Sequence, residues 1–306
     1  MAVRAAWLHY AGGHTQAEVA RKLGLTSLKA HRLITKANNE GLVKVYIDGD
    51  VAECVSIEGI LTEKHGLSYC QVVPDLEESD LPLKALGVAG GQFLKRTIEN
   101  SEHQSIGIGH GRTLAACANF LPRIHQPDKQ IVSLLGGFSK KFSANPHDVI
   151  HLLAERTHAS AYVMPVPFFA NTLKDKKVIL QQYGIKEVME LARKTSIKIA
   201  GIGAVNVNAS MVANAMLDKK DVRAAYKAGA RGEILGHFFA ADGRLVDTEL
   251  SERTMGLNAK DLSNTNIMAV AGGKIKVEAV KAILKSGLLS GLITDERTAR
   301  ALIDTK

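Results

Sequence analysis

Apolar residues near the start of the chain recur at helical spacing and are interrupted by residues that begin or end helices. Residues 2–10 predict a first short helix, with Trp7 on its apolar face. Thr15 followed by Glu18 has the spacing of a capping box and predicts the start of a second helix. Gly24 can end that helix in a left-handed conformation. We therefore expect short helices joined by tight turns.

A third helix is expected to begin after Thr26 and to stop at Gly41. Its apolar residues recur at helical spacing: Ala30, Leu33, Ile34 and Ala37. Two short helices joined by a turn that contains glycine are the pattern of a helix-turn-helix. The run L-V-K-V-Y-I after Gly41 alternates like a short strand and predicts a wing beside the third helix. Residues 1–50 are thus predicted to form a winged helix-turn-helix.

The polar face of the third helix is the candidate DNA-reading surface, because such a helix meets base edges in the major groove. The candidate DNA contacts are Gln16, Thr26, Ser27, Leu28, Lys29, His31, Arg32 and Lys36. Leu28 could touch a thymine methyl group, whereas Gln16, Lys29 and Lys36 are better placed for phosphate oxygens. The alternative is a helical hairpin that serves dimerisation and never touches nucleic acid.

Positive charge is concentrated in the same segment. The whole chain has a formal net charge of +8, and residues 1–47 hold seven Lys or Arg against Glu18 and Glu40. More than half of the excess charge therefore lies in less than a sixth of the chain. This distribution is typical of a small module that meets phosphates.

The pattern changes after a predicted turn at residues 48–50. One side of a helix that reaches about His65 is then marked by Val51, Cys54, Val55, Glu58 and Leu61. We assign residues 51–66 to a linker helix. Its apolar stripe could belong to the core of a larger domain or pack against a second subunit.

Beyond this helix, short β-rich runs alternate with helical stretches. The runs begin near residues 105, 130, 161, 197, 266 and 291. Such alternation indicates crossover helices and a mostly parallel sheet. We therefore predict an α/β protein in which residues 67–306 form a doubly wound, mostly parallel sheet. Several of the runs end in glycine, so a ligand crevice is expected at the carboxyl edge of the sheet.

The run G-I-G-H-G-R-T leads from one predicted strand into a helix. Glycines let backbone N–H groups approach an anion, and a helix N-terminus adds partial positive charge. Gly109, Gly111, Arg112 and Thr113 are therefore candidate ligand contacts. Arg112 stands where a dinucleotide-binding motif has its third glycine, and a complete phosphate-binding loop is absent. The alternative is a tight strand-to-helix turn without a ligand.

A later strand end, A-G-G-K-I-K, repeats this arrangement and places Lys276 in the first turn of a helix. A lysine there is unfavourable unless an anion is present, which favours a binding role for Lys276 over a solvated surface lysine. Glu233 lies in an apolar stretch, where a buried carboxylate needs partners such as sugar hydroxyls. Gly136 and Gly137, at the end of another predicted strand, complete the candidate set.

Other features of the sequence indicate where the protein is located and whether it binds a metal or a cofactor. No apolar run approaches the roughly 20 residues of a membrane span, and the first residues lack a signal-peptide pattern. Cys54, Cys70 and Cys117 show neither C-x-x-C spacing nor a nearby His cluster, which predicts reduced thiols rather than disulfides or a zinc site. We expect a cytoplasmic protein without a metal or a cofactor.

Taken along the whole chain, the motifs resemble the SorC family of sugar-binding transcription regulators, within the DeoR-like group. The resemblance rests on A-W-L-H-Y, T-Q-A-E-V-A-R-K-L-G-L, G-H-G-R-T-L, L-L-G-G, G-E-I-L-G, A-G-G-K-I-K and L-I-T-D-E-R-T-A. The segments A-H-R-L-I and C-Q-V-V-P-D-L resemble the erythritol-catabolism repressors of α-proteobacteria. Recognition helices of the family often read S-R-S-x-V-S-R, whereas this chain has T-S-L-K-A-H-R, so no operator sequence can be transferred.

The resemblance implies an effector domain similar in fold to ribose-5-phosphate isomerase and glucosamine-6-phosphate deaminase, usually in a homotetramer. It assigns phosphate contacts to Thr113 and Lys276 and contact with sugar hydroxyls to Glu233. We therefore expect a repressor of a carbohydrate or polyol catabolic operon, without catalytic residues. Its expected partners are a double-stranded DNA operator, a phosphorylated sugar or polyol and further copies of itself, as in a dimer of dimers.

Two other classes of function are alternatives to a regulator. Because the implied fold hosts an isomerase and a deaminase, the alternative is a sugar-phosphate enzyme with an accessory DNA-binding module. Glu233 or Asp242 could then serve as the base. An RNA-binding or scaffold protein is disfavoured, because no aromatic residues interleave the basic ones.

Overall fold

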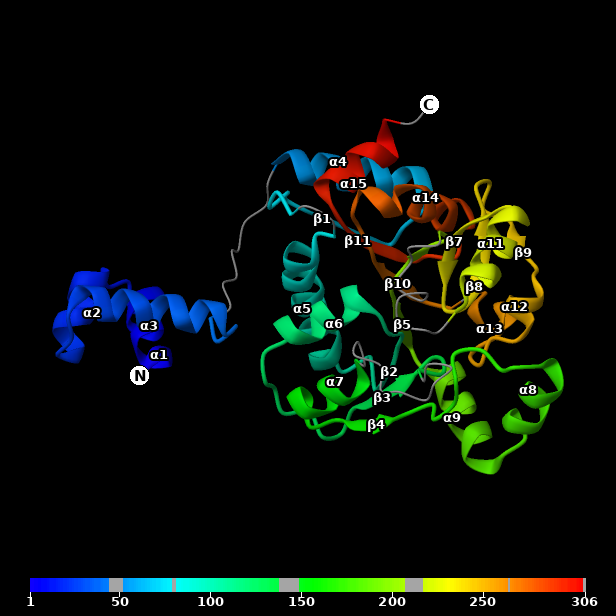
Figure 1. Cartoon of the computed structure of the whole chain (residues 1–306), viewed down its shortest axis with the longest axis horizontal. Coiled ribbons are helices and arrows are strands. Elements are labelled where there is room, and N and C mark those ends of the chain that lie inside the picture. Colours follow the sequence, from blue (N-terminus) through cyan, green and yellow to red (C-terminus); the bar gives the residue numbers. More distant parts are fainter. Residues whose placement is uncertain (44–51, 79–80, 138–148, 207–216, 264, 305–306) are drawn as a thin grey trace. The chain divides into compact units, whose positions relative to one another are not determined.

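The computed structural model describes residues 1–43, 52–78, 81–137, 149–206, 217–263 and 265–304. The chain divides into two compact units, Met1–Gly49 and Asp50–Lys306 (Figure 1). In the described part of the chain, no helix combines the length and the apolar character that crossing a membrane requires.

The described residues of the first unit hold α1 (Ala2–Tyr10), α2 (Gln16–Leu23) and α3 (Ser27–Asn39). The predicted capping box is confirmed, because Glu18 N–H donates to the Thr15 hydroxyl and Thr15 N–H donates to the Glu18 carboxylate at 2.8 Å. Gly24 ends α2 with a φ of 65°, and the Thr26 side chain caps α3. The two helices thus form a helix-turn-helix.

Small and branched side chains make the core of this unit: Ala5, Val19, Ala20, Ala30 and Ile34. The prediction that Trp7 faces the core is wrong. Trp7 is 63% exposed, and Ala5 and Ala6 form the buried face of α1 instead. The predicted wing lies outside the described residues from Lys44 onward.

A seven-stranded parallel sheet forms the centre of the second unit (Figure 1). In spatial order its strands are β1 (Tyr69–Val73), β11 (Gly291–Asp295), β10 (Ile267–Val270), β5 (Ile197–Ala200), β2 (Ser105–Ile108), β3 (Gln130–Ser133) and β4 (Ser160–Tyr162). All neighbouring pairs are parallel. The structure confirms the six strands expected from the sequence and adds β1.

Helices cover both faces of this sheet, which makes the fold doubly wound (Figure 1). One face packs against α5 (Leu83–Glu99), α6 (Arg112–Phe120) and α7 (Ile150–Thr157). The other face packs against α4 (Ala52–His65), α9 (Tyr183–Lys194), α14 (Val277–Lys285) and α15 (Glu296–Ile303). Successive residues serve opposite faces, so Leu292 and Ile293 of β11 enter different cores.

The helix predicted as a linker is α4, and it packs within the second unit. Its buried residues Cys54, Ile57 and Leu61 join the core beneath α15, whereas Val55 is 43% exposed. The Glu58 carboxylate accepts a hydrogen bond from Val72 N–H at 2.7 Å, which ties α4 to β1. Of the two alternatives for the apolar stripe, the structure therefore shows packing in the core of the larger unit.

A small antiparallel sheet continues from the carboxyl edge of the large one. Its strands are β6 (Gly203–Ala204), β7 (Ala230–Ile234), β8 (His237–Ala240) and β9 (Leu245–Val246). A turn at Asp242–Arg244 joins β8 to β9. The remaining described helices are α8 (Leu173–Leu180), α11 (Lys219–Lys227), α12 (Glu249–Glu252), α13 (Ala259–Leu262) and the 3-10 turn η1 (Lys274–Lys276).

The strand order of the large sheet reverses between β2 and β5. From β2 the chain adds β3 and β4 on one side, and from β5 it adds β10 and β11 on the other. Loops that follow the two strands at such a switch point diverge and leave a crevice at their carboxyl ends. The ends of β2 and β5 are therefore the expected position of a ligand.

Candidate functional site

The glycine-rich loop after β2 lies at this switch point. Gly109 N–H donates to the Ile199 carbonyl of β5 at 2.8 Å, so the loop starts against the neighbouring strand. Gly111 has a φ of 120°, a conformation that favours glycine, and no atom lies within 4 Å of where its Cβ would be. Arg112 then begins α6, whose first N–H groups lack partners within the helix.

Lys276 reaches this loop from the end of β10. Its ammonium donates to the Thr113 hydroxyl across 3.5 Å. Burial lowers the pKa of Lys276 to about 8, and the positive charge of Arg112 acts in the same direction. Lys276 was predicted in the first turn of a helix, but it ends η1 and α14 begins one residue later.

Glu233 enters the site from the small sheet. It is 7% exposed and lies opposite Gly203 in the β6–β7 ladder. A Cβ on Gly203 would lie 2.5 Å from the Glu233 carboxylate, so glycine leaves room for that group. Burial raises the pKa of Glu233 to about 7, although the hydrogen bond from Gly236 N–H and the charge of Lys276 act in the opposite direction.

The turn between β7 and β8 also borders the glycine-rich loop. Leu235 and Gly236 are its two residues, and their φ values of 51° and 82° are both positive, as a type I′ turn requires. A Cβ on Gly109 would lie 3.3 Å from the Leu235 side chain. A left-handed leucine costs about 1 kcal/mol or more, and such strain gathers at functional sites. Nothing in the sequence singled out Leu235.

Four of the predicted ligand residues thus converge at the carboxyl edge. Arg112 and Thr113 come from α6, Lys276 from the end of β10, and Glu233 from β7. Two cations, a hydroxyl group and a carboxylate can hold an anion on one side and hydroxyl groups on the other.

The two glycines after β3 have different surroundings. Gly136 N–H donates to the Met255 carbonyl at 2.7 Å, and a Cβ on Gly136 would collide with the backbone carbonyls of Val166 and Pro167. Close packing of the backbone therefore explains this glycine. Gly137 has open space where its Cβ would be. Ligand contact at either residue stays a prediction.

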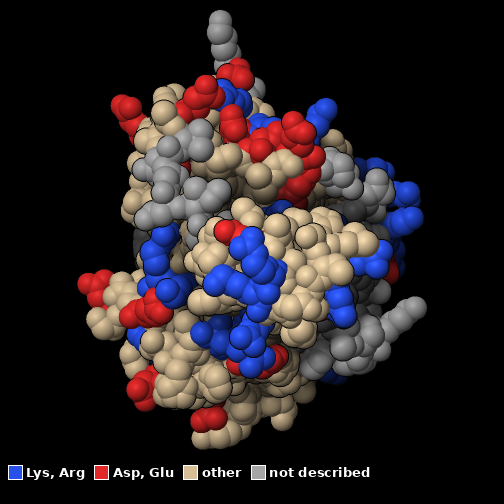
Figure 2. Space-filling view, turned by 90° about the vertical axis from the view of Figure 1, so that its left-hand side faces the viewer, with Lys and Arg blue, Asp and Glu red and all other residues tan. Residues whose placement is uncertain are grey.

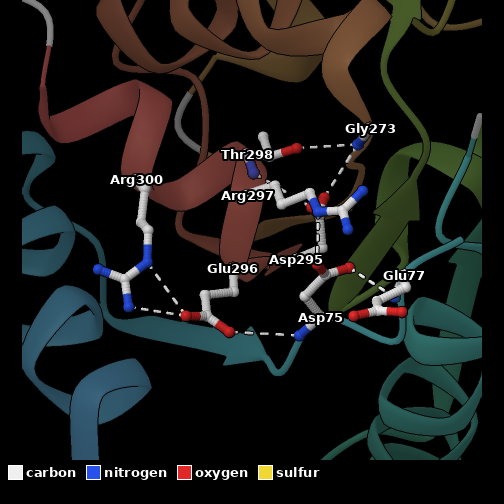
Figure 3. Close-up of polar contacts among 8 residues, drawn as sticks. All are labelled: Asp75, Glu77, Gly273, Asp295, Glu296, Arg297, Thr298 and Arg300. Carbon is white, nitrogen blue, oxygen red and sulfur yellow. Dashed lines mark hydrogen bonds and ion pairs between the residues drawn. The ribbon is translucent and has the colours of Figure 1, made fainter. Parts of the chain in front are cut away.

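Asp295, which sequence reasoning did not select, holds the loop that carries Lys276. Its carboxylate accepts hydrogen bonds from Gly273 N–H at 2.9 Å and from Thr298 N–H at 3.1 Å (Figure 3). The only available signal was its position at a strand end, within the segment L-I-T-D-E-R-T-A.

The first unit presents the second set of predicted residues to solvent. All eight candidate DNA contacts are exposed: Gln16, Thr26, Ser27, Leu28, Lys29, His31, Arg32 and Lys36. The His31 ring and the Gln16 side chain lie 3.2 Å apart, which brings the start of α2 beside the outer face of α3. A shallow hollow of about 350 Å³ is lined by His31, Arg32, Thr35, Lys36, Asn39 and Glu40. Figure 2 shows Lys and Arg side chains gathered on the surface of the first unit that faces the viewer.

Comparison with known proteins decides the family. Residues 49–304 match the family model described as "Putative sugar-binding domain". The erythritol catabolism regulatory protein EryD of Brucella abortus is 51% identical over 303 residues, which cover 99% of this chain and 96% of that protein. The chain belongs to the SorC family of sugar-binding transcription regulators. A transcriptional regulator named LsrR from an Enterobacter species is 29% identical over 99% of this chain and 92% of its own length.

Solved structures of SorC-type regulators share the fold. The full-length sorbitol operon regulator SorC of Klebsiella pneumoniae covers 99% of this chain and 98% of its own, with a TM-score of 0.74 and 25% identity. A DeoR family regulator of Listeria monocytogenes covers 82% of this chain and 99% of its own, with the same TM-score and 26% identity. These findings confirm the predicted family, including its erythritol-related subgroup, and the α/β fold class.

The described residues of this SorC-family chain contain no cluster of three His, Cys, Asp or Glu side chains that could hold a metal ion. The thiols of Cys54, Cys70 and Cys117 are free, and burial raises the pKa of Cys70 and of Cys117 to about 12. A thiol that stays protonated is a poor nucleophile, so neither residue is suited to reaction chemistry.

Proposed function

We propose that this chain represses a carbohydrate or polyol catabolic operon and that a phosphorylated sugar or polyol controls its binding to the operator. The observation that carries the proposal is the convergence of Arg112, Thr113, Lys276 and Glu233 at the switch point of the sheet.

The cationic side of the site is suited to a phosphate group. Lys276 and Arg112 supply positive charge, Thr113 supplies a hydroxyl, and the start of α6 supplies backbone N–H groups. An anion beside Lys276 also offsets the unfavourable burial of its ammonium. Phosphate binding would therefore reduce the free-energy cost of burying the Lys276 ammonium.

The acidic side of the site is suited to hydroxyl groups. The Glu233 carboxylate accepts one hydrogen bond, from Gly236 N–H at 2.6 Å, and carboxylate oxygens can accept several more. Sugar and polyol hydroxyls are donors of the required kind. The name of the relative EryD points to erythritol, and we therefore propose a short polyol or its phosphate as the effector.

Operator binding belongs to the first unit in this proposal. The exposed face of α3 would enter the major groove, with Ser27, Leu28 and His31 toward base edges. Helix-turn-helix regulators read two half-sites with two copies, which supports a homo-oligomer such as a dimer of dimers. The effector then acts by binding more tightly to the arrangement that fails to fit both half-sites.

Paired variants test the assignment of the two sites. Lys276→Ala should abolish the effect of erythritol phosphate on operator binding while the affinity for operator DNA without it stays unchanged. Arg32→Ala should weaken operator binding and leave the thermal shift caused by erythritol phosphate intact. Titrations against the chain's own promoter region and against random DNA, at several salt concentrations, supply the readout. Equal loss of both activities in either variant would contradict the assignment.

An enzymatic role is the second candidate, and one observation favours it. A carboxyl group with a pKa of about 7, as in Glu233, is suited to general base catalysis at neutral pH. Asp242 lies in an exposed turn, where it pairs with Arg244 at 2.7 Å. Turnover of a pentose or tetrose phosphate that Glu233→Gln abolishes would establish an enzyme, and absence of turnover would leave the regulator.

A further inference from the structure

Asp295 is a buried carboxylate that binds two separate segments, the loop after β10 and the start of α15. It is the last residue of β11 and is 3% exposed. One oxygen accepts from Gly273 N–H at 2.9 Å, and the other accepts from Thr298 N–H at 3.1 Å and so caps α15 (Figure 3). A single side chain thus fixes both the loop after β10 and the start of α15.

The loop after β10 is shaped around this carboxylate. A Cβ on Gly272 would collide with the Asp295 oxygen, and Gly273 has a φ of 100°. Gly273 N–H also donates to the Thr298 hydroxyl at 2.8 Å, and the Gly273 carbonyl accepts from Lys276 N–H at 2.8 Å. The position of the Lys276 backbone therefore depends on where Asp295 holds Gly273.

Contacts of α15 extend the connection to α4. The Arg300 guanidinium lies 2.7 Å from the Glu296 carboxylate on its own helix and 2.6 Å from the Glu53 carboxylate in the first turn of α4. Helix α4 packs against α15 and is the first described element after the first unit. A movement of the loop after β10 would therefore reach, through α15, the helix that follows that unit.

We propose that Asp295 is a positioning residue of the effector site, which holds Lys276 for the phosphate and links that loop to α15. The proposal rests on the function proposed above. A carboxylate is required because both of its oxygens accept. An asparagine can accept from only one of the two N–H groups, and its NH₂ group then faces the other N–H group. Charge-assisted hydrogen bonds are about twice as strong as neutral ones, so we expect the loss of one to shift this loop.

The test compares Asp295→Asn with Glu296→Gln in the full chain. Both changes remove one negative charge at the start of α15, but the Glu296 carboxylate contacts Asp75 N–H and Arg300 rather than the loop. With inorganic phosphate and erythritol phosphate as probes, calorimetric titration should show affinity at least about tenfold weaker for Asp295→Asn. Glu296→Gln should bind both probes as the unaltered chain does.

A double-mutant cycle separates positioning from general destabilisation. If Asp295 acts by placing Lys276, then Asp295→Asn should have little further effect on phosphate affinity in a chain that already carries Lys276→Ala. Equal weakening in both backgrounds would overturn the proposal. Thr298→Val offers the same test if Asp295→Asn does not fold, because it removes one acceptor of Gly273 N–H and nearly keeps the side-chain shape. We expect it to weaken binding about threefold.

The outcomes also separate this proposal from the one on which it rests. Unchanged affinity in Asp295→Asn, together with weakened affinity in Lys276→Ala, would overturn the positioning role alone. Unchanged affinity in both variants would contradict the proposed effector site, and the positioning role of Asp295 with it.

Discussion

Glu233 and Lys276 have opposite pKa shifts for the same physical reason. Burial raises the pKa of Glu233 to about 7 and lowers the pKa of Lys276 to about 8, because water stabilises the charged form of each group. Near neutral pH the folded protein therefore buries two side chains, Glu233 and Lys276, whose charged forms would be more stable in water. Sites built for a ligand often carry such costs in its absence.

Glu233→Gln should stabilise the ligand-free protein at alkaline pH. The pKa of Glu233 is higher in the folded than in the unfolded chain, so the folded chain binds more protons between these two values and loses stability as pH rises. The gain in the free energy of unfolding should be on the order of 2 to 3 kcal/mol at pH 8 and should shrink to a minor part of that near pH 5.

Urea unfolding followed by circular dichroism at the two pH values measures this difference. Glu249→Gln is the control, because the Glu249 side chain is 86% exposed and its removal should have no such pH dependence. The same gain at both pH values would show that charge burial is not its cause.

Single residues set the limit of what the sequence could predict about the site. Lys276 and Glu233 stood out because a cation at a helix start and an acid in an apolar run conflict with local physics. Asp295 did not, because an Asp before E-R-T-A needs no explanation beyond capping a helix. Its second hydrogen bond, to Gly273, depends on parallel pairing of β10 with β11. The left-handed conformation of Leu235 leaves no mark in the sequence at all.

At the scale of elements, the sequence predicted helices and strands correctly where several local signals agreed. The helices of the first unit were predictable because caps, turn glycines and apolar spacing agreed. Six strands of the large sheet were predictable because they are apolar runs that alternate with helices. The strands β6 and β9 have two residues each, too few for any periodicity to appear. The strand order of the sheet depends on pairing across long distances, which local patterns do not encode.

Thr15→Ala should destabilise the first unit by about 1 kcal/mol, because it removes the side-chain half of the capping box on α2. Trp7 is the only tryptophan in the chain and lies in α1, so its fluorescence follows unfolding of this unit selectively. Thr35→Ala is the matched control, since Thr35 is exposed within α3, where alanine favours the helix. Equal stability of the Thr15→Ala chain and the unaltered chain would show that the cap contributes nothing.

At the scale of the whole molecule, the two units differ in charge and in the candidate residues that they hold. The positive surplus of the first residues belongs to the first unit, and the candidate effector site lies wholly in the second unit. This division was predictable, because charge and motif content both change near residue 50. The place of α4 was not predictable, because its apolar stripe is equally compatible with a core or with a partner.

Removal of residues 1–49 should abolish operator binding and preserve the thermal shift caused by erythritol phosphate. Removal of residues 1–66 should instead destabilise the remaining chain, because it takes Cys54, Ile57 and Leu61 out of the core. Dye-based thermal melts of the two shortened chains, with and without the probe, measure the difference. Equal melting temperatures would place α4 outside the folded core, contrary to its burial here.

The edge strand β1 gives this chain an order of assembly. Its partner in the sheet is β11, so residues 69–73 cannot pair until residues 291–295 have been synthesised. The first unit is built from contacts within about fifty residues, and such local structure can fold early during translation. A ribosome that stalls before β11 would therefore release a chain whose first unit can fold while β1 still lacks its partner strand.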